Sequence, residues 1–86
     1  LHDGIEKEIK FNGQNQWVRT EWEVRQLPDA VKNTITAQGY TLDDNEFGYV
    51  ETADSIWYEV EVRKGRNELK LYISPTGEIL RTEYDD

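Results

Sequence analysis

The 86-residue sequence predicts a small α+β domain in which one α-helix packs on an antiparallel β-sheet. Three observations predict this fold. One segment carries apolar residues at helical spacing, and the segments after it alternate apolar and polar residues with the period of β-strands. Short turns rich in glycine, proline and small polar residues join these segments, which favours antiparallel hairpins. A motif near the N-terminus also recurs near the C-terminus, which indicates a repeated structural element.

The helix is predicted between Pro28 and Gly39. Proline is tolerated at the first helical position and glycine is a common helix terminator. Leu27, Val31 and Ile35 follow one another at intervals of four residues, so they share one helical face. This face is a narrow apolar stripe suited to packing on a sheet.

Six strands are predicted around this helix, in the order β-β-α-β-β-β-β. They comprise residues 5–11, 16–25, 47–52, 56–63, 69–73 and 79–84. Within Ile56–Arg63 the aliphatic residues share one face, while Trp57 and charged residues share the other. We therefore expect the helix to cover one sheet face and the other face to meet water. A regular strand would turn only one of Trp17 and Trp22 toward the core.

The repeated motif lies at the two ends of the chain. Trp17–Trp22 (WVRTEW) recurs as Ile79–Tyr84 (ILRTEY), and each copy follows a turn that contains a glycine, Gly13 or Gly77. The simplest interpretation is a unit of roughly 60 residues that ends in a hairpin, with an extra copy of that hairpin at the start of the chain.

Length and charge restrict the classes of function. A chain of 86 residues fits one domain, residues 1–86. The net charge of −8 makes binding to nucleic-acid phosphates unfavourable, so no nucleic-acid partner is predicted. No apolar run approaches the roughly 20 residues that span a bilayer, so no membrane insertion is predicted.

Enzymatic chemistry finds little support in the sequence. The chain has no cysteine, and its one histidine, His2, lies next to the N-terminus. Nucleophile–histidine systems therefore cannot be assembled. We predict no catalytic residues, no cofactor and no enzymatic activity.

The acidic segment after the helix invites comparison with a calcium-binding loop. Asp43, Asn45 and Gly48 fall at the first, third and sixth positions of such a loop, and Asp54 falls at the twelfth. However, Phe47 occupies a position where an oxygen ligand is needed, and no second helix is predicted. The sequence favours an acidic turn with no metal site, and cation binding at residues 43–54 is kept as an alternative.

A partner-binding site is predicted on the polar face of the sheet. Trp57, Glu59 and Glu61 alternate with apolar residues on one strand, and Tyr72 points outward from the next. Aromatic residues on exposed surfaces commonly anchor protein interfaces, and carboxylates steer basic partners. In the alternative interpretation these rings form cross-strand pairs, or the N-terminal hairpin covers them.

Several residues together resemble a known family. They are Trp17, Thr20, Val24, Leu27, Pro28, Val31, Ile35, Tyr40, Tyr58-Glu59-Val60-Glu61-Val62, Glu68, Leu69 and Gly77. This pattern, between about residues 9 and 84, resembles the PepSY-like family. Its members are also described as β-lactamase-inhibitor-like proteins and are frequent in gut Bacteroidetes.

The resemblance implies helix-plus-four-strand units, often in tandem, in which the last hairpin of one unit runs into the helix of the next. Residues 5–25 then resemble the final hairpin of a preceding unit, and residues 27–84 resemble a complete unit. The chain differs from a tandem member because it lacks a second helix.

The resemblance also implies export to the periplasm or cell surface, and the family contributes no catalytic residues. The sequence therefore predicts a noncatalytic, periplasmic or secreted module that binds a protein partner, in its specific version an inhibitor of a hydrolase. The alternative is a structural or small-ligand envelope protein that has no protein target.

Overall fold

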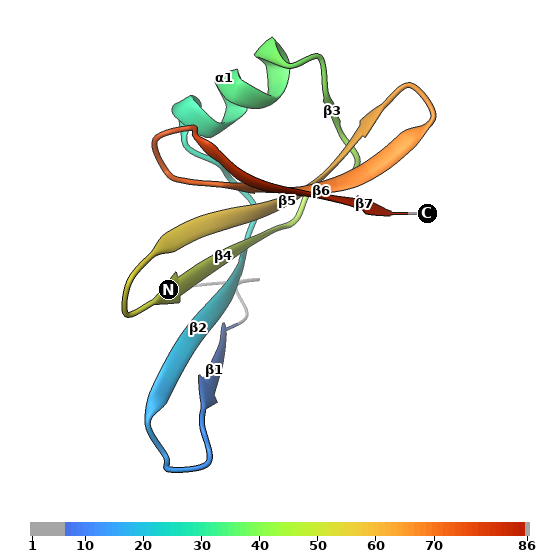
Figure 1. Cartoon of the computed structure of the whole chain (residues 1–86). Coiled ribbons are helices and arrows are strands. Elements are labelled where there is room, and N and C mark those ends of the chain that lie inside the picture. Colours follow the sequence, from blue (N-terminus) through green and yellow to red (C-terminus); the bar gives the residue numbers. More distant parts are fainter. Residues whose placement is uncertain (1–6, 86) are drawn as a thin grey trace.

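The computed structural model describes residues 7–85 and contains, within them, one helix on a seven-stranded antiparallel sheet (Figure 1). The elements are β1 (Lys7–Phe11), β2 (Trp17–Val24), α1 (Asp29–Ala37), β3 (Thr41–Leu42), β4 (Phe47–Thr52), β5 (Ile56–Lys64), β6 (Asn67–Ile73) and β7 (Ile79–Asp85). The strand order is β1-β2-β4-β5-β6-β7, and β3 pairs with β5. The predicted fold class is confirmed. The first two residues of the predicted first strand and His2 lie outside the described residues.

One short strand was not predicted. Thr41 and Leu42 form β3 and pair with Arg63 and Val62 at the end of β5 that β4 does not reach. The chain leaves the helix at Gly39, whose φ of 82° turns it sharply toward the sheet. Two residues carry no detectable alternation, so the sequence does not reveal this strand.

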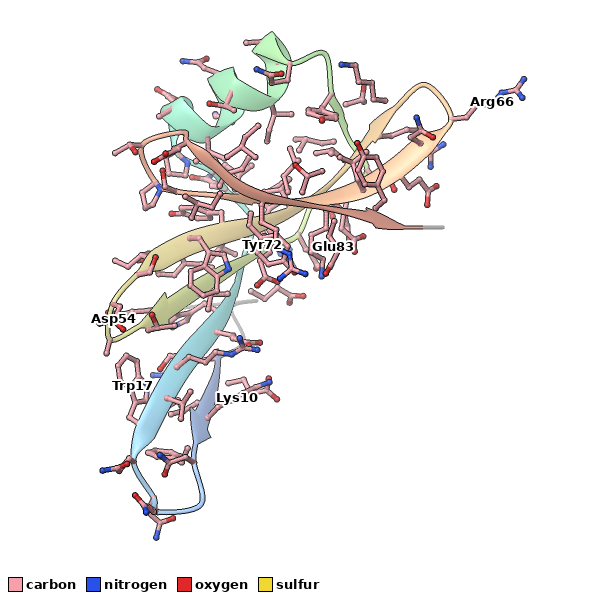
Figure 2. The ribbon with its side chains drawn as sticks, viewed as in Figure 1. Lys10, Trp17, Asp54, Arg66, Tyr72 and Glu83 are labelled. Carbon is pink, nitrogen blue, oxygen red and sulfur yellow. The ribbon has the colours of Figure 1, made fainter. Side chains whose placement is uncertain are left out.

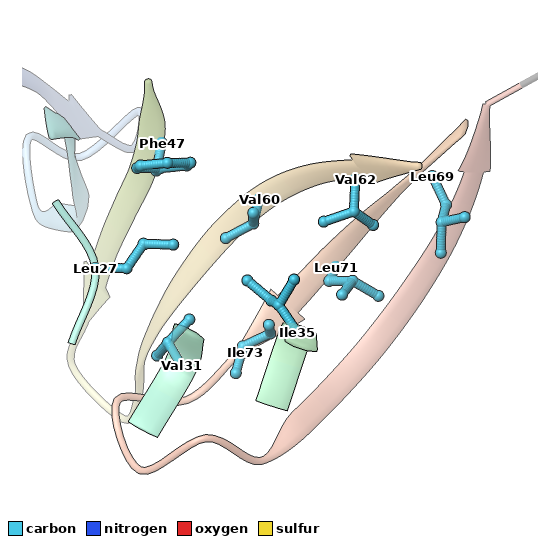
Figure 3. Close-up of a cluster of buried hydrophobic side chains, with 9 residues drawn as sticks. All are labelled: Leu27, Val31, Ile35, Phe47, Val60, Val62, Leu69, Leu71 and Ile73. Carbon is cyan, nitrogen blue, oxygen red and sulfur yellow. The ribbon is translucent and has the colours of Figure 1, made fainter. Parts of the chain in front are cut away.

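The helix packs on the centre of the C-terminal half of the sheet (Figure 3). Val31 and Ile35 are buried against β5 and β6, as the predicted stripe requires. The buried cluster consists of Leu27, Val31, Ile35, Phe47, Val60, Val62, Leu69, Leu71 and Ile73. Burial of each aliphatic side chain stabilises the fold by about 1.5–3 kcal/mol, so this cluster holds the helix on the sheet.

The turn between β6 and β7 is fastened to the helix. Thr34 Oγ1 donates a hydrogen bond of 2.6 Å to the carbonyl of Gly77. Gly77 has a φ of 97°, and a Cβ added there would lie 2.8 Å from the Ala30 carbonyl oxygen. Only glycine allows this approach between turn and helix.

The hairpin formed by β1 and β2 extends away from the helix (Figure 1) but repeats the construction of the β6–β7 hairpin. The amide of Asn12 bonds the Gln16 carbonyl at 2.9 Å, and the amide of Ser74, 62 positions later, bonds the Glu78 carbonyl at 2.8 Å. The pairing register shifts at equivalent places, after Lys10 and after Tyr72. The sequence repeat therefore corresponds to two hairpins with the same backbone hydrogen bonds.

This correspondence changes the interpretation of the two glycine turns. The counterpart of Gly77 is Asn15, which also has a positive φ, of 59°, and not Gly13. Asparagine tolerates the left-handed conformation better than most residues. Aligning the two turns by their glycines, Gly13 with Gly77, would therefore place the hairpins two residues out of register.

The register shift also affects the two tryptophans of β2. Trp17 Nε1 donates to Thr20 Oγ1 at 2.8 Å, and the Trp22 ring lies 5.4 Å from the Tyr49 ring. Because Thr20 and Trp22 point to the same side of β2, both tryptophans lie on the side of the sheet that carries α1. The expectation that only one faces this side was wrong, because β2 is not regular.

We predict that Gly77→Ala destabilises the protein by about 2–4 kcal/mol, from strain at positive φ and from the clash with the helix. The midpoint of urea unfolding at an unchanged m-value measures this loss.

The matched control is Gly13→Ala, because a Cβ at this turn residue would meet no atom within 4 Å. It should change stability by about 0.5 kcal/mol or less. Equal losses in the two variants would contradict the fastening of the turn to α1.

Candidate partner-binding face

The candidate site lies on the sheet face opposite α1, which we call the outer face. Its side chains alternate along each strand with the residues packed toward the helix. They include Glu21 and Glu23 of β2, Gly48 and Val50 of β4, Trp57, Glu59 and Glu61 of β5, Lys70 and Tyr72 of β6, and Arg81 and Glu83 of β7.

The four residues predicted from the sequence all lie on this face. Glu59 pairs with Tyr72 across β5 and β6, and Glu61 pairs with Lys70. Trp57 pairs with Val50 of β4 on the other side of β5. Among the predicted residues, Glu59 and Tyr72 are direct cross-strand partners, a relation that places Cβ atoms about 4.5–5.5 Å apart. Trp57 and Glu61 lie on either side of Glu59 along β5.

Glu59 is the residue that connects these side chains. It accepts a hydrogen bond of 3.0 Å from Trp57 Nε1 through Oε2. Its Oε1 lies 3.9 Å from the ammonium group of Lys70. Glu61, in contrast, makes no ion pair within 4 Å among residues 7–85, so its charge is available to a partner.

Tyr72 is held in place from the last strand. Its hydroxyl donates to Glu83 at 3.2 Å (Figure 2). The Arg81 guanidinium lies over its ring, 5.4 Å from the ring centroid. Burial is the main cause that raises the pKa of Tyr72 above 10.0; the Glu59 charge and the Glu83 contacts act in the same direction, while Arg81 opposes them. The hydroxyl is therefore neutral and already hydrogen-bonded within the outer face.

Val50 shows that the outer face is hollow instead of flat. It is fully buried although it lies opposite the helix-side core, where it pairs with Trp57 and Glu21. The twist of the sheet curls neighbouring strands over it. A signal exists in the sequence, because β4 carries apolar residues on both faces: Phe47 and Tyr49 on one, Val50 on the other.

One part of this hollow, which we call the acidic groove, has a volume of about 480 Å³. Its lining includes seven carboxylates and two lysines. These are Glu8, Glu21, Glu23, Asp44, Glu46, Glu59 and Glu61, with Lys7 and Lys70. Gly48 contributes bare backbone between the side chains of β2 and β5, which leaves the groove open. The groove therefore presents a strongly negative, concave surface.

The two predicted aromatic residues line a second, adjacent hollow of about 550 Å³. Trp57 and Tyr72 stand there beside three cations, Arg19, Lys70 and Arg81. Neither Arg19 nor Arg81 belongs to the site predicted from the sequence. They come from the two repeated hairpins, which lie far from β5 in the sequence, and only the strand pairing brings them to this face.

The calcium-loop alternative does not match the geometry. Residues 47–52 form β4, so an extended strand of about 20 Å separates Asp43 from Asp54. Asp43 instead pairs with Arg63 at 3.0 Å, and Asp54 lies at the distant β4–β5 turn (Figure 2). Within residues 7–85 no group of three or more acidic, histidine or cysteine side chains is arranged to hold a metal ion.

The family is established by a family model described as "Putative beta-lactamase-inhibitor-like, PepSY-like", which matches residues 1–81. The chain belongs to this PepSY-like family. The resemblance noted in the sequence is thus confirmed, and it suggests a noncatalytic binding module.

Solved structures support the PepSY-like fold. A DUF2874 family protein from Bacteroides uniformis has 26% identity and a TM-score of 0.79, over 98% of this chain and 66% of that chain. A BLIP-like protein from Bacteroides fragilis has 28% identity and a TM-score of 0.76, over 98% and 63%. A Bacteroides eggerthii protein, described as "putative periplasmic", has 18% identity and a TM-score of 0.78, over 98% and 66%, and shows the fold alone.

The PepSY-like chain thus spans between 63% and 66% of the length of these three solved chains. No curated protein matches it significantly. Within residues 7–85, no helix has the length and apolar character required to cross a membrane.

We predict that the free energy of unfolding falls as the pH rises above about 10 and that Tyr72→Phe reduces this loss. Burial raises the folded-state pKa of Tyr72, so folding favours the protonated phenol. This contribution is fully present below the unfolded pKa and is lost as the pH rises through the folded pKa. Urea unfolding at pH 9, 10 and 11 measures the effect.

Tyr58 provides an independent check, because burial and then Tyr49 raise its pKa in the same direction. A Tyr58→Phe/Tyr72→Phe double variant should lose less stability with pH than either single variant. If Tyr72→Phe follows the wild-type pH dependence, the assignment of the alkaline loss to this hydroxyl is wrong.

Proposed function

We propose that this PepSY-like chain is a noncatalytic, exported module that binds a protein partner on its outer face, and that the partner is a secreted or periplasmic hydrolase which it inhibits. The observation that carries the proposal is the acidic groove beside Trp57 and Tyr72. A concave surface with seven carboxylates and two lysines complements a basic protein segment.

The rings and the charges have different roles in this proposal. The polar atoms of Trp57 and Tyr72 are bonded within the face, to Glu59 and Glu83. The rings therefore offer held, apolar anchor surfaces whose ordering costs little on binding. Glu61, which makes no ion pair within residues 7–85, and the other groove carboxylates attract a basic partner and orient its approach. Inhibition then follows from steric occlusion of the bound hydrolase.

A catalytic role receives no comparable support. The chain contains no cysteine and its one histidine is His2, so within residues 7–85 no cysteine or histidine is present to form a nucleophile–histidine pair on the outer face. Glu59 is occupied by Trp57 and Lys70, and Glu21 is paired with Arg19 at 2.6 Å. These carboxylates serve to organise the surface.

Export is part of the proposal. The fold neighbour from Bacteroides eggerthii is described as "putative periplasmic", and a periplasmic or secreted chain would meet periplasmic or secreted hydrolases.

We predict that Trp57→Ala/Tyr72→Ala weakens binding of the partner at least tenfold, because central aromatic anchors carry much of the binding energy of an interface. The wild-type chain and the variant are immobilised, exposed to a periplasmic extract of the organism that encodes the chain, and the retained protein is identified. Affinity is then measured with the purified partner. If that partner is a hydrolase, stoichiometric wild-type chain should abolish its activity.

The control for the aromatic variant is Ile56→Ala, which removes an exposed apolar side chain on the opposite face of β5. It should bind within twofold of wild type. Retention of full affinity by the double variant, with both proteins folded, would contradict the proposed site.

We also predict that Glu59→Gln/Glu61→Gln slows association and flattens its dependence on salt, because steering between exposed charges is screened at higher ionic strength. Association rates at 50 and 300 mM salt provide the measurement.

The control is Gly48→Val, which fills the groove without changing its charge. The added Cβ would lie in ordinary contact, 3.5 Å from the Glu59 Cβ, and the valine methyl groups would occupy the groove. It should weaken binding without changing the salt dependence. Identical salt dependence in the charge variant and wild type would exclude steering by this groove.

A further inference from the structure

The outer face carries two adjacent hollows of opposite charge. Seven carboxylates and two lysines line the acidic groove, which gives its lining a net charge of −5. The second hollow, which we call the cationic hollow, is lined by Arg19, Lys70 and Arg81 and by a single carboxylate, that of Glu59. Its lining therefore has a net charge of +2, opposite in sign to the net charge of −8 of the whole chain.

The composition of the chain does not favour a cationic hollow. The chain has eighteen acidic and ten basic residues, yet the hollow takes three of the basic residues and one of the acidic ones. The two arginines come from the tripeptide that is identical in the two repeated hairpins, Arg19-Thr20-Glu21 and Arg81-Thr82-Glu83. Because β2 and β7 flank β4, β5 and β6 in the strand order, the two copies supply one guanidinium each, from opposite sides, to the same hollow.

Each arginine is oriented by the glutamate two residues after it. Arg19 Nη2 lies 2.6 Å from Glu21 Oε2, and Arg81 Nη2 lies 3.0 Å from Glu83 Oε2. A guanidinium carries five N–H donors over three nitrogen atoms. The glutamates therefore hold the two guanidinium groups in place without using all of their donors.

Glu59 and Lys70 mark the border between the two hollows, because both residues line each of them. Glu59 Oε1 lies 3.9 Å from Lys70 Nζ, beyond hydrogen-bond distance, so this pair is a loose one. The sign of the surface charge changes across it. A partner that places a positive group in the acidic groove therefore meets a cluster of positive charge directly beside that group.

We infer that the cationic hollow receives a carboxylate of the protein partner, the side chain of an aspartate or glutamate, while basic residues of the same partner occupy the acidic groove. This inference rests on the proposed function for the existence of the partner, and it adds the chemistry by which the partner is recognised. The partner surface then carries a basic group and an acidic group side by side, in the order that matches the two hollows.

The lining of the cationic hollow suits a carboxylate on an apolar stem. Guanidinium groups bind carboxylates through paired N–H donors, and the ammonium group of Lys70 adds a point charge. The rings of Trp57 and Tyr72 and the exposed side chain of Leu80 supply apolar surface beside these cations. The methylene groups of an aspartate or glutamate side chain can pack against that surface.

A free anion fits less well than a carboxylate presented by a bound protein. Glu21 and Glu83 offset the charges of Arg19 and Arg81 at short range, so only a modest attraction is left for a small ligand. The Arg81 side chain is 65% exposed, so water also screens this attraction. A carboxylate on a protein that already contacts the acidic groove is present at a high effective concentration, which compensates for the weak local attraction.

The first test uses the isolated chain and does not depend on the partner. Nα-acetylglutamate amide, whose one charge is its side-chain carboxylate, is titrated to about 100 mM at constant ionic strength, so that screening stays the same. NMR signals of the indole N–H groups report binding. The Trp57 signal should shift saturably, whereas the signals of Trp17 and Trp22, on the other side of the sheet, should not. Nα-acetylglutamine amide, the neutral isostere, should shift none of them.

The matched variants compare the arginines of the hollow with cations elsewhere. Arg19→Gln/Arg81→Gln should bind the glutamate probe at least fivefold more weakly, because charge-assisted hydrogen bonds are lost. The control Lys32→Gln/Arg66→Gln removes the same two charges from α1 and from the β5–β6 turn (Figure 2), and it should bind within twofold of wild type. None of these four side chains is buried, so both variants should fold.

Three results of this titration would overturn the inference. The first is the absence of a saturable shift of the Trp57 signal. The second is equal affinity of the wild-type chain and the arginine variant for the glutamate probe. The third is tighter binding of inorganic phosphate than of the glutamate probe, which would assign the hollow to a free oxyanion.

The second test uses a partner captured by the wild-type chain. Arg19→Gln/Arg81→Gln makes the chain more negative by two charges, so a partner recognised only through basic residues should bind this variant more tightly. The inference predicts the opposite, an affinity at least tenfold lower than that of Lys32→Gln/Arg66→Gln. Tighter binding by the arginine variant would overturn the inference and leave the proposed function in place. Failure to capture any partner would count against the proposed function, and the titration would still decide the chemistry of the hollow.

Discussion

The structure depends on the packing of one short helix against a sheet much wider than itself. Val31 and Ile35 bury against β5 and β6, and the Thr34–Gly77 hydrogen bond holds the adjoining turn. A nine-residue helix is about 14 Å long and about 10 Å across, whereas six neighbouring strands span about 24 Å. The helix can cover only part of one face. The distribution of aromatic, charged and exposed residues elsewhere follows from this mismatch.

Two surfaces of the sheet are not covered by the helix, and they differ in how their side chains are packed. On the outer face, sheet twist buries Val50, and pairs such as Trp57–Glu59 and Tyr72–Glu83 satisfy the polar atoms within the surface. This face also carries the acidic groove. On the helix side of the β1–β2 hairpin, Trp17 is also hydrogen-bonded, to Thr20, but the rings of Phe11 and Trp17 remain large, apolar and exposed. The first surface is the one on which we propose that a partner binds, and the second is exposed within residues 7–85.

The sequence predicts those features that depend on local periodicity. The helix stripe, the long strands and the common face of Trp57, Glu59 and Glu61 all follow from spacing within one segment. Features that depend on register between distant segments are not accessible in this way. Arg19 and Arg81 join the aromatic residues only through strand pairing, and the side taken by Trp17 depends on a register shift opposite Phe11. Strand β3 has only two residues, so its sequence shows no alternation of apolar and polar side chains. The repeat and its 62-residue offset were visible in the sequence, but the positive φ that Asn15 shares with Gly77 is shown only by the structure.

Native-state amide hydrogen exchange across the whole 86-residue chain measures most directly how stability is distributed between the strands beneath the helix and the β1–β2 hairpin. If the helix is the determinant of stability, amides of β5 and β6 beneath Val31 and Ile35 should exchange only through global unfolding. Amides of β1 and β2 should exchange at least a hundredfold faster, through local opening of an uncovered hairpin. Equal protection of the two hairpins would contradict the central claim, because the β1–β2 hairpin would then be stabilised without a covering helix.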